Sequence, residues 1–305
     1  MDYILSIVIL GGINMVAVLG LSIFTGFTGL FSLGHAAFVA VGAYTSAILT
    51  YYYYVNYYLA LAAGAAAAGA VSLIIGAPTL RAKLRSDYFA IAVLGFGEAL
   101  RVLLENLEIT NGARGLPGID SFTTLPVVLT CLVGGVLVAR NFLRSRGGAA
   151  CIAIREDHVA AETAGVRLFR TRLLSLVVSA VYCGLSGGLL AHFLSFIQPQ
   201  MFTLVQSTQL LAAVIAGGMG SLSGPLIASF VFIALPEALR VAQMWRLVAY
   251  GLLLVLIMVF RPQGLLGYSE LSSLFRRGVV REGERRFACC WRTWRSRTVR
   301  GDCPG

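Results

Sequence analysis

Charged side chains are scarce in this chain of 305 residues. Only 12% of the residues are charged, whereas 58% are hydrophobic, and the mean hydropathy is +0.81. A soluble globular protein carries about 25% charged residues, so this composition cannot cover a soluble surface. The composition therefore predicts a polytopic membrane protein, and the lengths of its apolar runs indicate an all-α fold.

Several chemical signatures are also missing. The six cysteines form no CxxC pair, which leaves no sign of a disulfide framework or a metal site. The only lysine, Lys83, is not preceded by the glycines of a Walker A sequence, so the chain is not expected to bind ATP. No Ser/His/Asp set or metal-ligand spacing is present. We predict no catalytic residue, no metal and no cofactor bound by this chain, which argues against an intramembrane enzyme.

Apolar runs long enough to cross a bilayer recur along the sequence. About 20 apolar residues span the hydrocarbon layer. Such runs lie at 3–24, 33–50, 57–77, 87–105, 123–143, 172–197 and 245–260. A longer run, 206–240, is interrupted by glycines at 217–225, and a pair of short or broken helices fits it. We expect about seven to nine crossings with discontinuous helices, in a transmembrane domain of residues 1–267.

The distribution of basic residues predicts the orientation. Ten of the 24 basic side chains lie in residues 261–305, and the loop 144–172 is also net positive, whereas the loop 105–122 is net negative. Because basic loops stay on the cytoplasmic side, we expect an outside N-terminus and a cytoplasmic C-terminus. The first run lacks a basic n-region and a cleavage site, so it is interpreted as a retained span.

The residues that follow the last apolar run form a basic tail, 268–305. Its arginine-rich composition without a sustained apolar period predicts a disordered cytoplasmic segment. Trp291 and Trp294 could contact membrane lipid there, and a solvated tail is the alternative. Nucleic-acid binding is not expected.

The loop 144–172 is a polar insertion between two apolar runs and holds six arginines and three acids. Drawn as one helix, its core 154–166 places small residues on one side, which suits a partner groove, with charges fixing the orientation. We interpret it as a docking helix for a cytoplasmic partner; a surface loop without a partner is the alternative. The candidate residues are Arg155, Glu156, Asp157, Ala160, Ala161, Glu162, Ala164 and Gly165.

Glycines and isolated polar groups mark candidate elements of a translocation path or breaks in helices. Gly34, His35 and Gly42 suggest a discontinuous helix beside a path, although His35 could instead be a packing histidine. Glu98 can pair with the arginine three residues later, either inside the bundle or near its outer mouth. A break within the membrane is predicted at Gly217, Gly218, Gly220, Gly224 and Pro225.

Two outer elements have ordinary interpretations as well. The polar, glycine-rich segment 110–118 could form a turn over a pore mouth, contact a binding protein, or simply connect two helices. The tyrosine cluster 51–58 and His192 are expected at the membrane interface.

Over about residues 15–267 the chain resembles the M-type permease subunits of branched-chain amino acid ABC transporters. The resemblance rests on several motifs in the expected order: Gly26-Phe-Thr-Gly29, Ser32-Leu-Gly-His-Ala-Ala-Phe38, Tyr88-Phe-Ala-Ile-Ala92, Thr110-Asn-Gly-Ala-Arg-Gly-Leu116, Ala153-Ile-Arg-Glu-Asp157, Gly217-Gly-Met-Gly-Ser-Leu-Ser-Gly-Pro225 and Phe260-Arg-Pro-Gln-Gly-Leu-Leu-Gly267.

The resemblance implies the ABC importer permease fold and a set of partners. These are a second permease subunit in a heterodimer, two cytoplasmic ATPase subunits that bind ATP and Mg²⁺, and an extracytoplasmic substrate-binding protein. It places the chain in the bacterial inner membrane and makes loop 144–172 the segment that couples to the ATPases. Where such importers often show Glu-Ala-Ala-x-x-x-Gly, this chain has Val159 in place of the glutamate, followed by Ala160-Ala161-x-x-x-Gly165.

Two other transport functions compete with this interpretation. Related urea permeases tend to read Gly-His-Gly-Ala-Phe, whereas this chain has Gly34-His-Ala-Ala-Phe38, which favours the amino-acid branch over an importer of urea or short amides. A stand-alone secondary transporter would also contain broken helices at membrane depth.

Overall fold

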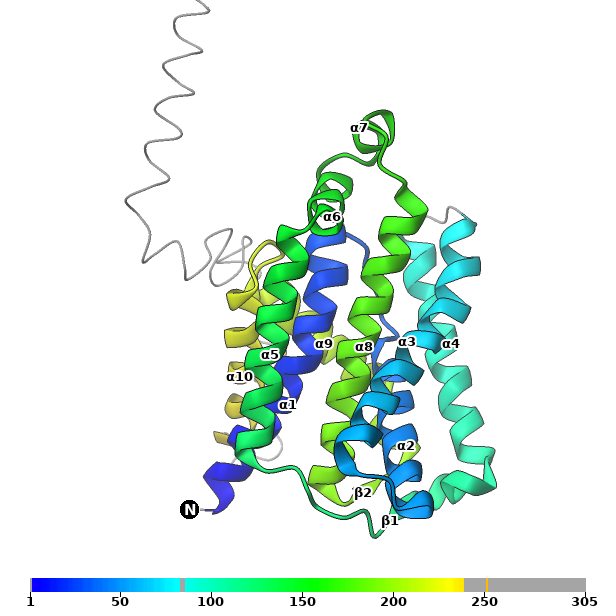
Figure 1. Cartoon of the computed structure of the whole chain (residues 1–305), viewed down its shortest axis with the longest axis vertical. Coiled ribbons are helices and arrows are strands. Elements are labelled where there is room, and N and C mark those ends of the chain that lie inside the picture. The colour runs from blue at the N-terminus through cyan, green and yellow to red at the C-terminus, as the bar shows by residue number, and fades with distance from the viewer. Residues whose placement is uncertain (1, 83–85, 239–250, 252–305) are drawn as a thin grey trace, which may run out of the picture. The chain divides into compact units, whose positions relative to one another are not determined.

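The computed structural model describes residues 2–82, 86–238 and 251, all within one compact unit, Met1–Tyr268. In chain order its elements are α1 (Asp2–Leu21), the π-helical η1 (Ser22–Gly26), α2 (His35–Tyr53), α3 (Tyr57–Arg81), α4 (Ser86–Asn106), η2 (Glu108–Thr110), η3 (Gly112–Arg114), β1 (Leu116–Pro117), α5 (Leu125–Arg144), α6 (Arg146–Glu156), α7 (His158–Thr163), α8 (Leu168–Leu194), β2 (Phe196–Ile197), η4 (Pro199–Met201), α9 (Leu204–Gly217) and α10 (Ser223–Ala238) (Figure 1). The predicted all-α architecture is confirmed, since β1 and β2 are the only strands among the described residues.

The helices reproduce the apolar runs of the sequence. Four described helices are long and apolar enough to cross a membrane, namely Tyr3–Gly26, Tyr57–Arg81, Leu125–Arg144 and Leu168–Leu194. α2, α4, α9 and α10 coincide with the other runs up to residue 238. The predicted tail 268–305 and nearly all of run 245–260 lie outside the described residues, so the number of crossings stays a prediction.

The bundle has two distinct ends. α6 and α7 lie at one end, here called the α6–α7 end, and β1 and β2 lie at the opposite one, the β1–β2 end (Figure 1). β1 pairs antiparallel with β2 through Leu116 and Ile197. Gly115 permits this approach because its φ is +79° and a Cβ there would lie 2.3 Å from the Ile197 carbonyl oxygen. The segment 110–118 thus consists of short 3-10 turns and β1, which pairs with the strand that follows α8.

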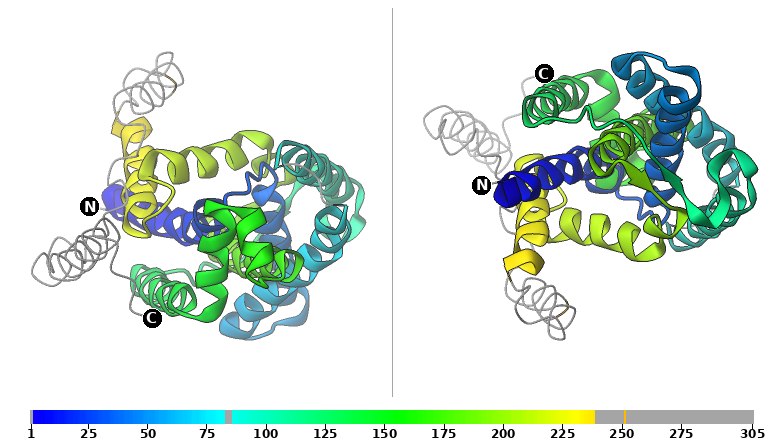
Figure 2. Two further views of the ribbon diagram at one scale, coloured as in Figure 1. Left: turned by 90° about the horizontal axis from the view of Figure 1, so that it is seen from above. Right: turned by 90° about the horizontal axis from the view of Figure 1, so that it is seen from below.

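Close packing of glycines joins the central helices. α8 packs against α1, α2 and α3, and α1 also packs against α5, α9 and α10 (Figures 1 and 2). A Cβ on Gly42 of α2 would lie 2.1 Å from the carbonyl oxygen of Gly184 in α8. Such contacts are how membrane helices gain dispersion energy without a hydrophobic driving force between them. Gly42 therefore serves helix packing.

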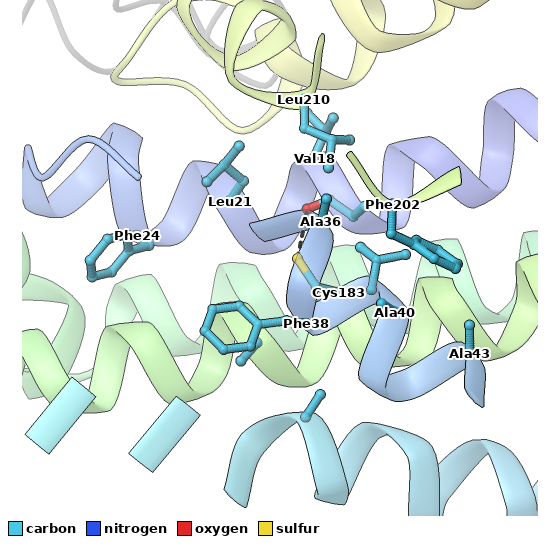
Figure 3. Packing of buried hydrophobic residues seen from close by; sticks show 14 of the residues in the cluster. Val18, Leu21, Phe24, Ala36, Phe38, Ala40, Ala43, Cys183, Phe202 and Leu210 are labelled. Carbon is cyan, nitrogen blue, oxygen red and sulfur yellow. Dashed lines mark hydrogen bonds between the residues drawn. The ribbon is translucent and has the colours of Figure 1, made fainter. Parts of the chain in front are cut away.

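An apolar cluster lies beside this contact. Figure 3 shows Phe24, Phe38 and Phe202 within it, with Cys183 of α8 near their centre. The Cys183 Sγ donates a weak hydrogen bond to the Ala17 carbonyl oxygen across 3.9 Å, which ties α8 to α1. Cys183 is buried there, as free cysteines, which act as small apolar residues, usually are.

Substitution of Gly42 tests the packing account. Gly42→Ala should lower the free energy of unfolding by about 1–3 kcal/mol, because the added methyl group cannot fit against a backbone carbonyl. Thermal unfolding of the protein in detergent measures this. Gly134→Ala in α5 is the matched control, since a Cβ there meets nothing within 4 Å and alanine favours a helix by about 0.5–1 kcal/mol. Equal melting temperatures for the two variants would contradict the account.

Candidate functional site

The predicted docking segment is two short helices that meet at Asp157. Asp157 has extended backbone angles (φ −155°, ψ 112°) and caps α7, because its Oδ1 accepts N–H bonds from Val159 at 2.8 Å and Ala160 at 3.2 Å. The prediction of one continuous helix over 154–166 is therefore wrong. The bonds from Ala160 and Val159 lower the pKa of the Asp157 carboxyl, so the cap persists at neutral pH and weakens as the pH falls through that lowered pKa.

The break at Asp157 changes which residues face outward. Ala161, placed by a continuous helix on the docking face, is only 4% exposed and packs inward. Val159, by contrast, is 58% exposed. The exposed candidates are Glu156, Asp157, Ala160, Glu162, Ala164 and Gly165. Gly165, with φ +87°, ends α7 and makes room for the Val166 amide to bond the Ala161 carbonyl.

Two breaks in the bundle lie near α6. The first covers residues 29–34, where Gly29 has φ +75°, and the second covers residues 218–222, where Gly218 has φ +112°. The predicted interruption of the run 206–240 is thus confirmed.

The ends of α9 and α10 meet closely at the second break. A Cβ on Gly217 would lie 2.3 Å from the Pro225 nitrogen, and one on Gly224 would lie 2.1 Å from the Gly217 carbonyl oxygen. Gly220 donates its N–H to the Gly218 carbonyl oxygen at 2.9 Å, which tightens the turn. Pro225 fits because the first turn of a helix needs no N–H donor.

Arg155, in the last turn of α6, connects both breaks. Its Nη1 donates to the carbonyl oxygen of Gly26 at 3.0 Å and to that of Met219. Its Nη2 donates to Glu156 Oε1 at 2.7 Å, and the side chain is 18% exposed. Gly29 leaves room for the arginine stem, since a Cβ there would lie 3.0 Å from Arg155 Cγ. One side chain of the predicted docking segment therefore holds the chain at both interruptions.

His35 is a packing residue at the start of α2. It is completely buried, with Nδ1 2.7 Å from Ser32 Oγ and Nε2 2.8 Å from Ser179 Oγ. Its polar groups are thus satisfied, by serine hydroxyls of its own segment and of α8. Gly34 allows α2 to approach α4, because a Cβ there would lie 2.3 Å from the Val93 carbonyl oxygen.

Glu98 and His192 both have defined contacts. Glu98 pairs with Arg101 at 2.9 Å, and Arg101 also pairs with Glu105 at 2.8 Å, all on the partly exposed surface of α4 toward the β1–β2 end. His192, expected at the interface, is buried, with Nδ1 2.8 Å from the Gly188 carbonyl oxygen and Nε2 3.1 Å from Thr50 Oγ1.

Two cavities open beside these elements. The larger, of about 930 Å³, lies between α3, α7 and the start of α8, and its lining includes Arg81, Arg155, Arg167, Arg172 and Glu162. It is therefore strongly basic. The residues described hold no group of three or more side chains that could bind a metal ion.

The smaller cavity, of about 310 Å³, lies between α1, α8 and α9. Asn14, Gln206 and Gln209 contribute amide groups to its lining. The sequence reasoning missed this set, although three amides inside apolar runs would have been a usable signal.

Comparison with known proteins identifies the family of this chain. The model of the family described as "Branched-chain amino acid transport system / permease component" matches residues 3–260. Two relatives carry the name high-affinity branched-chain amino acid transport system permease protein LivM. The one from Escherichia coli K12 is 32% identical across 86% of this chain and 70% of its own length. The one from Salmonella typhimurium LT2 is 33% identical across 81% of this chain and 66% of its own length.

No solved structure matches the chain. The family match nevertheless includes both breaks, Arg155 and every helix described up to residue 238. With its long apolar helices, the chain is a multi-pass membrane transport protein and belongs to the permease family of branched-chain amino acid transport systems.

Proposed function

We propose that this chain is a membrane-spanning permease subunit of an ATP-driven importer for branched-chain or related hydrophobic amino acids in the bacterial inner membrane. The names of the relatives support the solute class. The sequence contains no Walker A motif, so ATP and Mg²⁺ would bind to separate ATPase subunits. This chain itself would bind no cofactor and perform no catalysis.

The orientation follows from charge. The α6–α7 end carries the basic loop 144–172 and would face the cytoplasm, where two ATPase subunits dock. The β1–β2 end would face outward and receive solute from a binding protein. A second, related permease subunit would complete the pathway.

The mechanism that we propose is alternating access driven through α7. Exposed α7 residues and the arginine-lined cavity beside them offer a surface for an ATPase with acidic side chains. The observation that carries the mechanism is the Arg155 contact, because it joins α6 to both breaks. Movement of α6 and α7 on ATP binding would therefore displace the ends of η1 and α9 together.

The docking surface is tested at Ala160, an exposed residue of α7. Ala160→Trp should weaken co-purification of the ATPase about tenfold, which corresponds to ~1.4 kcal/mol, because the bulky ring prevents close approach. Ala160→Ser should bind normally. Ala70→Trp, at an exposed alanine of α3, controls for the substitution itself. Full ATPase binding by Ala160→Trp would contradict docking at α7.

Coupling is tested at Arg155. Arg155→Gln should leave membrane insertion intact but reduce amino-acid uptake per ATP hydrolysed at least about tenfold, since glutamine lacks the charge and fork of donors that two carbonyls need. Uptake and hydrolysis are measured in proteoliposomes that contain the whole complex. Arg170→Gln, at an exposed arginine of α8, is the matched control. Native coupling in Arg155→Gln would refute the mechanism.

Uptake assays in the same proteoliposomes distinguish the proposed importer from the two competing kinds of transporter. A secondary transporter would take up leucine under an ion gradient without ATP, because broken helices alone can support that function. An importer of urea or short amides would accept those solutes in preference to leucine. The proposal requires ATP dependence and competition by valine and isoleucine.

A further inference from the structure

We infer that the cavity between α1, α8 and α9 binds the solute during passage, and that it selects a zwitterionic amino acid with an uncharged aliphatic side chain. This inference rests on the proposed function, because it assigns a site to the proposed solute. The cavity measures about 310 Å³ and is bordered by α1, α2, α8, η4 and α9. Its composition and one unsatisfied polar atom carry the argument.

The polar lining suits a zwitterion. Asn14, Gln206 and Gln209 present amides, and an amide offers two N–H donors to a carboxylate and a carbonyl oxygen to an ammonium group. Gln206 Oε1 is buried and has no hydrogen-bond partner. Buried acceptors are nearly always satisfied in native proteins, and an orphan calls for an explanation. Gln206 lines the cavity, so a turn of its side chain would bring this oxygen to the ammonium group of a bound solute.

The apolar lining suits an aliphatic side chain. Leu10, Ile13, Val39, Leu190 and Leu194 face the cavity, and among the described residues that line it none is charged. A lysine or glutamate solute would therefore bring an unpaired charge into an apolar wall, which is strongly unfavourable. The absence of an ion pair also keeps binding weak, as a path requires, since a tightly held solute would not move on.

The position of the cavity links it to the coupling segment. Two of its walls are α1 and α9. α1 continues through η1 to Gly26, and α9 is followed by the turn that contains Met219, so both helices lead to carbonyl groups that Arg155 binds. Ser207, the neighbour of Gln206, accepts the Ala36 N–H at 3.1 Å and so ties α9 to the start of α2. A displacement of α6 would therefore change the spacing of the cavity walls.

Direct binding is the first test. Saturation-transfer NMR on the complete transporter in nanodiscs, without the binding protein, should give a leucine signal and none for lysine. Gln206→Leu should weaken the leucine signal about tenfold, the cost of one hydrogen bond to a charged group. Thr208→Val, an exposed polar change on α9 outside the cavity lining, should leave it unchanged. Absence of a leucine signal from the native complex, or an unchanged one from Gln206→Leu, would overturn the site.

Transport is the second test and separates the two proposals. With saturating leucine-loaded binding protein, Gln206→Leu and Gln209→Leu should lower uptake about tenfold while ATPase association and solute-free ATP hydrolysis stay native. Native uptake in both variants would overturn the cavity site and leave the proposed function intact. Uptake by the native complex that needs no ATP would refute the proposed function, while the NMR signal would still decide the cavity.

Discussion

A mostly buried arginine with three acceptors is the constraint on which the rest of this structure depends. The Arg155 guanidinium lies against the carbonyl oxygens of Gly26 and Met219 and beside the Glu156 carboxylate. A buried cation is tolerated only when its hydrogen-bond donors are satisfied. Gly26 is the last residue of η1 and Met219 lies in the turn after α9, and helix C-termini favour a positive charge. The two interruptions therefore supply acceptors for the arginine, and the arginine stabilises the chain at both of them.

The same contact connects the proposed ATPase-docking surface on α7 with the proposed solute cavity. α7 presents an exposed surface, α6 carries Arg155, and the helices that lead into its two carbonyl partners form walls of the amide-lined cavity. Close glycine packing joins α2, α3 and α8, as at Gly42 and Gly184, and α1 is tied to α8 as well, because a Cβ on Gly20 would lie 2.7 Å from the Ser179 carbonyl oxygen. α9 is therefore the wall that a small shift at α6 would move, which would change the width of the cavity.

Features set by local sequence could be predicted, and those set by distant contacts could not. The glycines around Gly218 predicted a break because only glycine adopts its backbone angles without strain. The prediction of a continuous docking helix was wrong because the Asp157 carboxylate accepts hydrogen bonds from the backbone amides that follow it. An aspartate before a helical run is nevertheless a recognisable capping signal. Ser179, a partner of His35, lies 144 residues away from it, and the carbonyl partners of Arg155 lie 129 and 64 residues away, beyond any local pattern.

The most direct test of the central claim is a set of distances between spin labels in the complete transporter, with and without ATP. Labels replace Val159 on α7, Met219 in the second break and Tyr54 near the β1–β2 end, all exposed positions, in a protein without other reactive cysteines. If Arg155 links the coupling segment to the breaks, ATP should leave the distance from 159 to 219 unchanged while both distances to 54 change. Movement of 159 relative to 219, with 219 fixed relative to 54, would contradict the account.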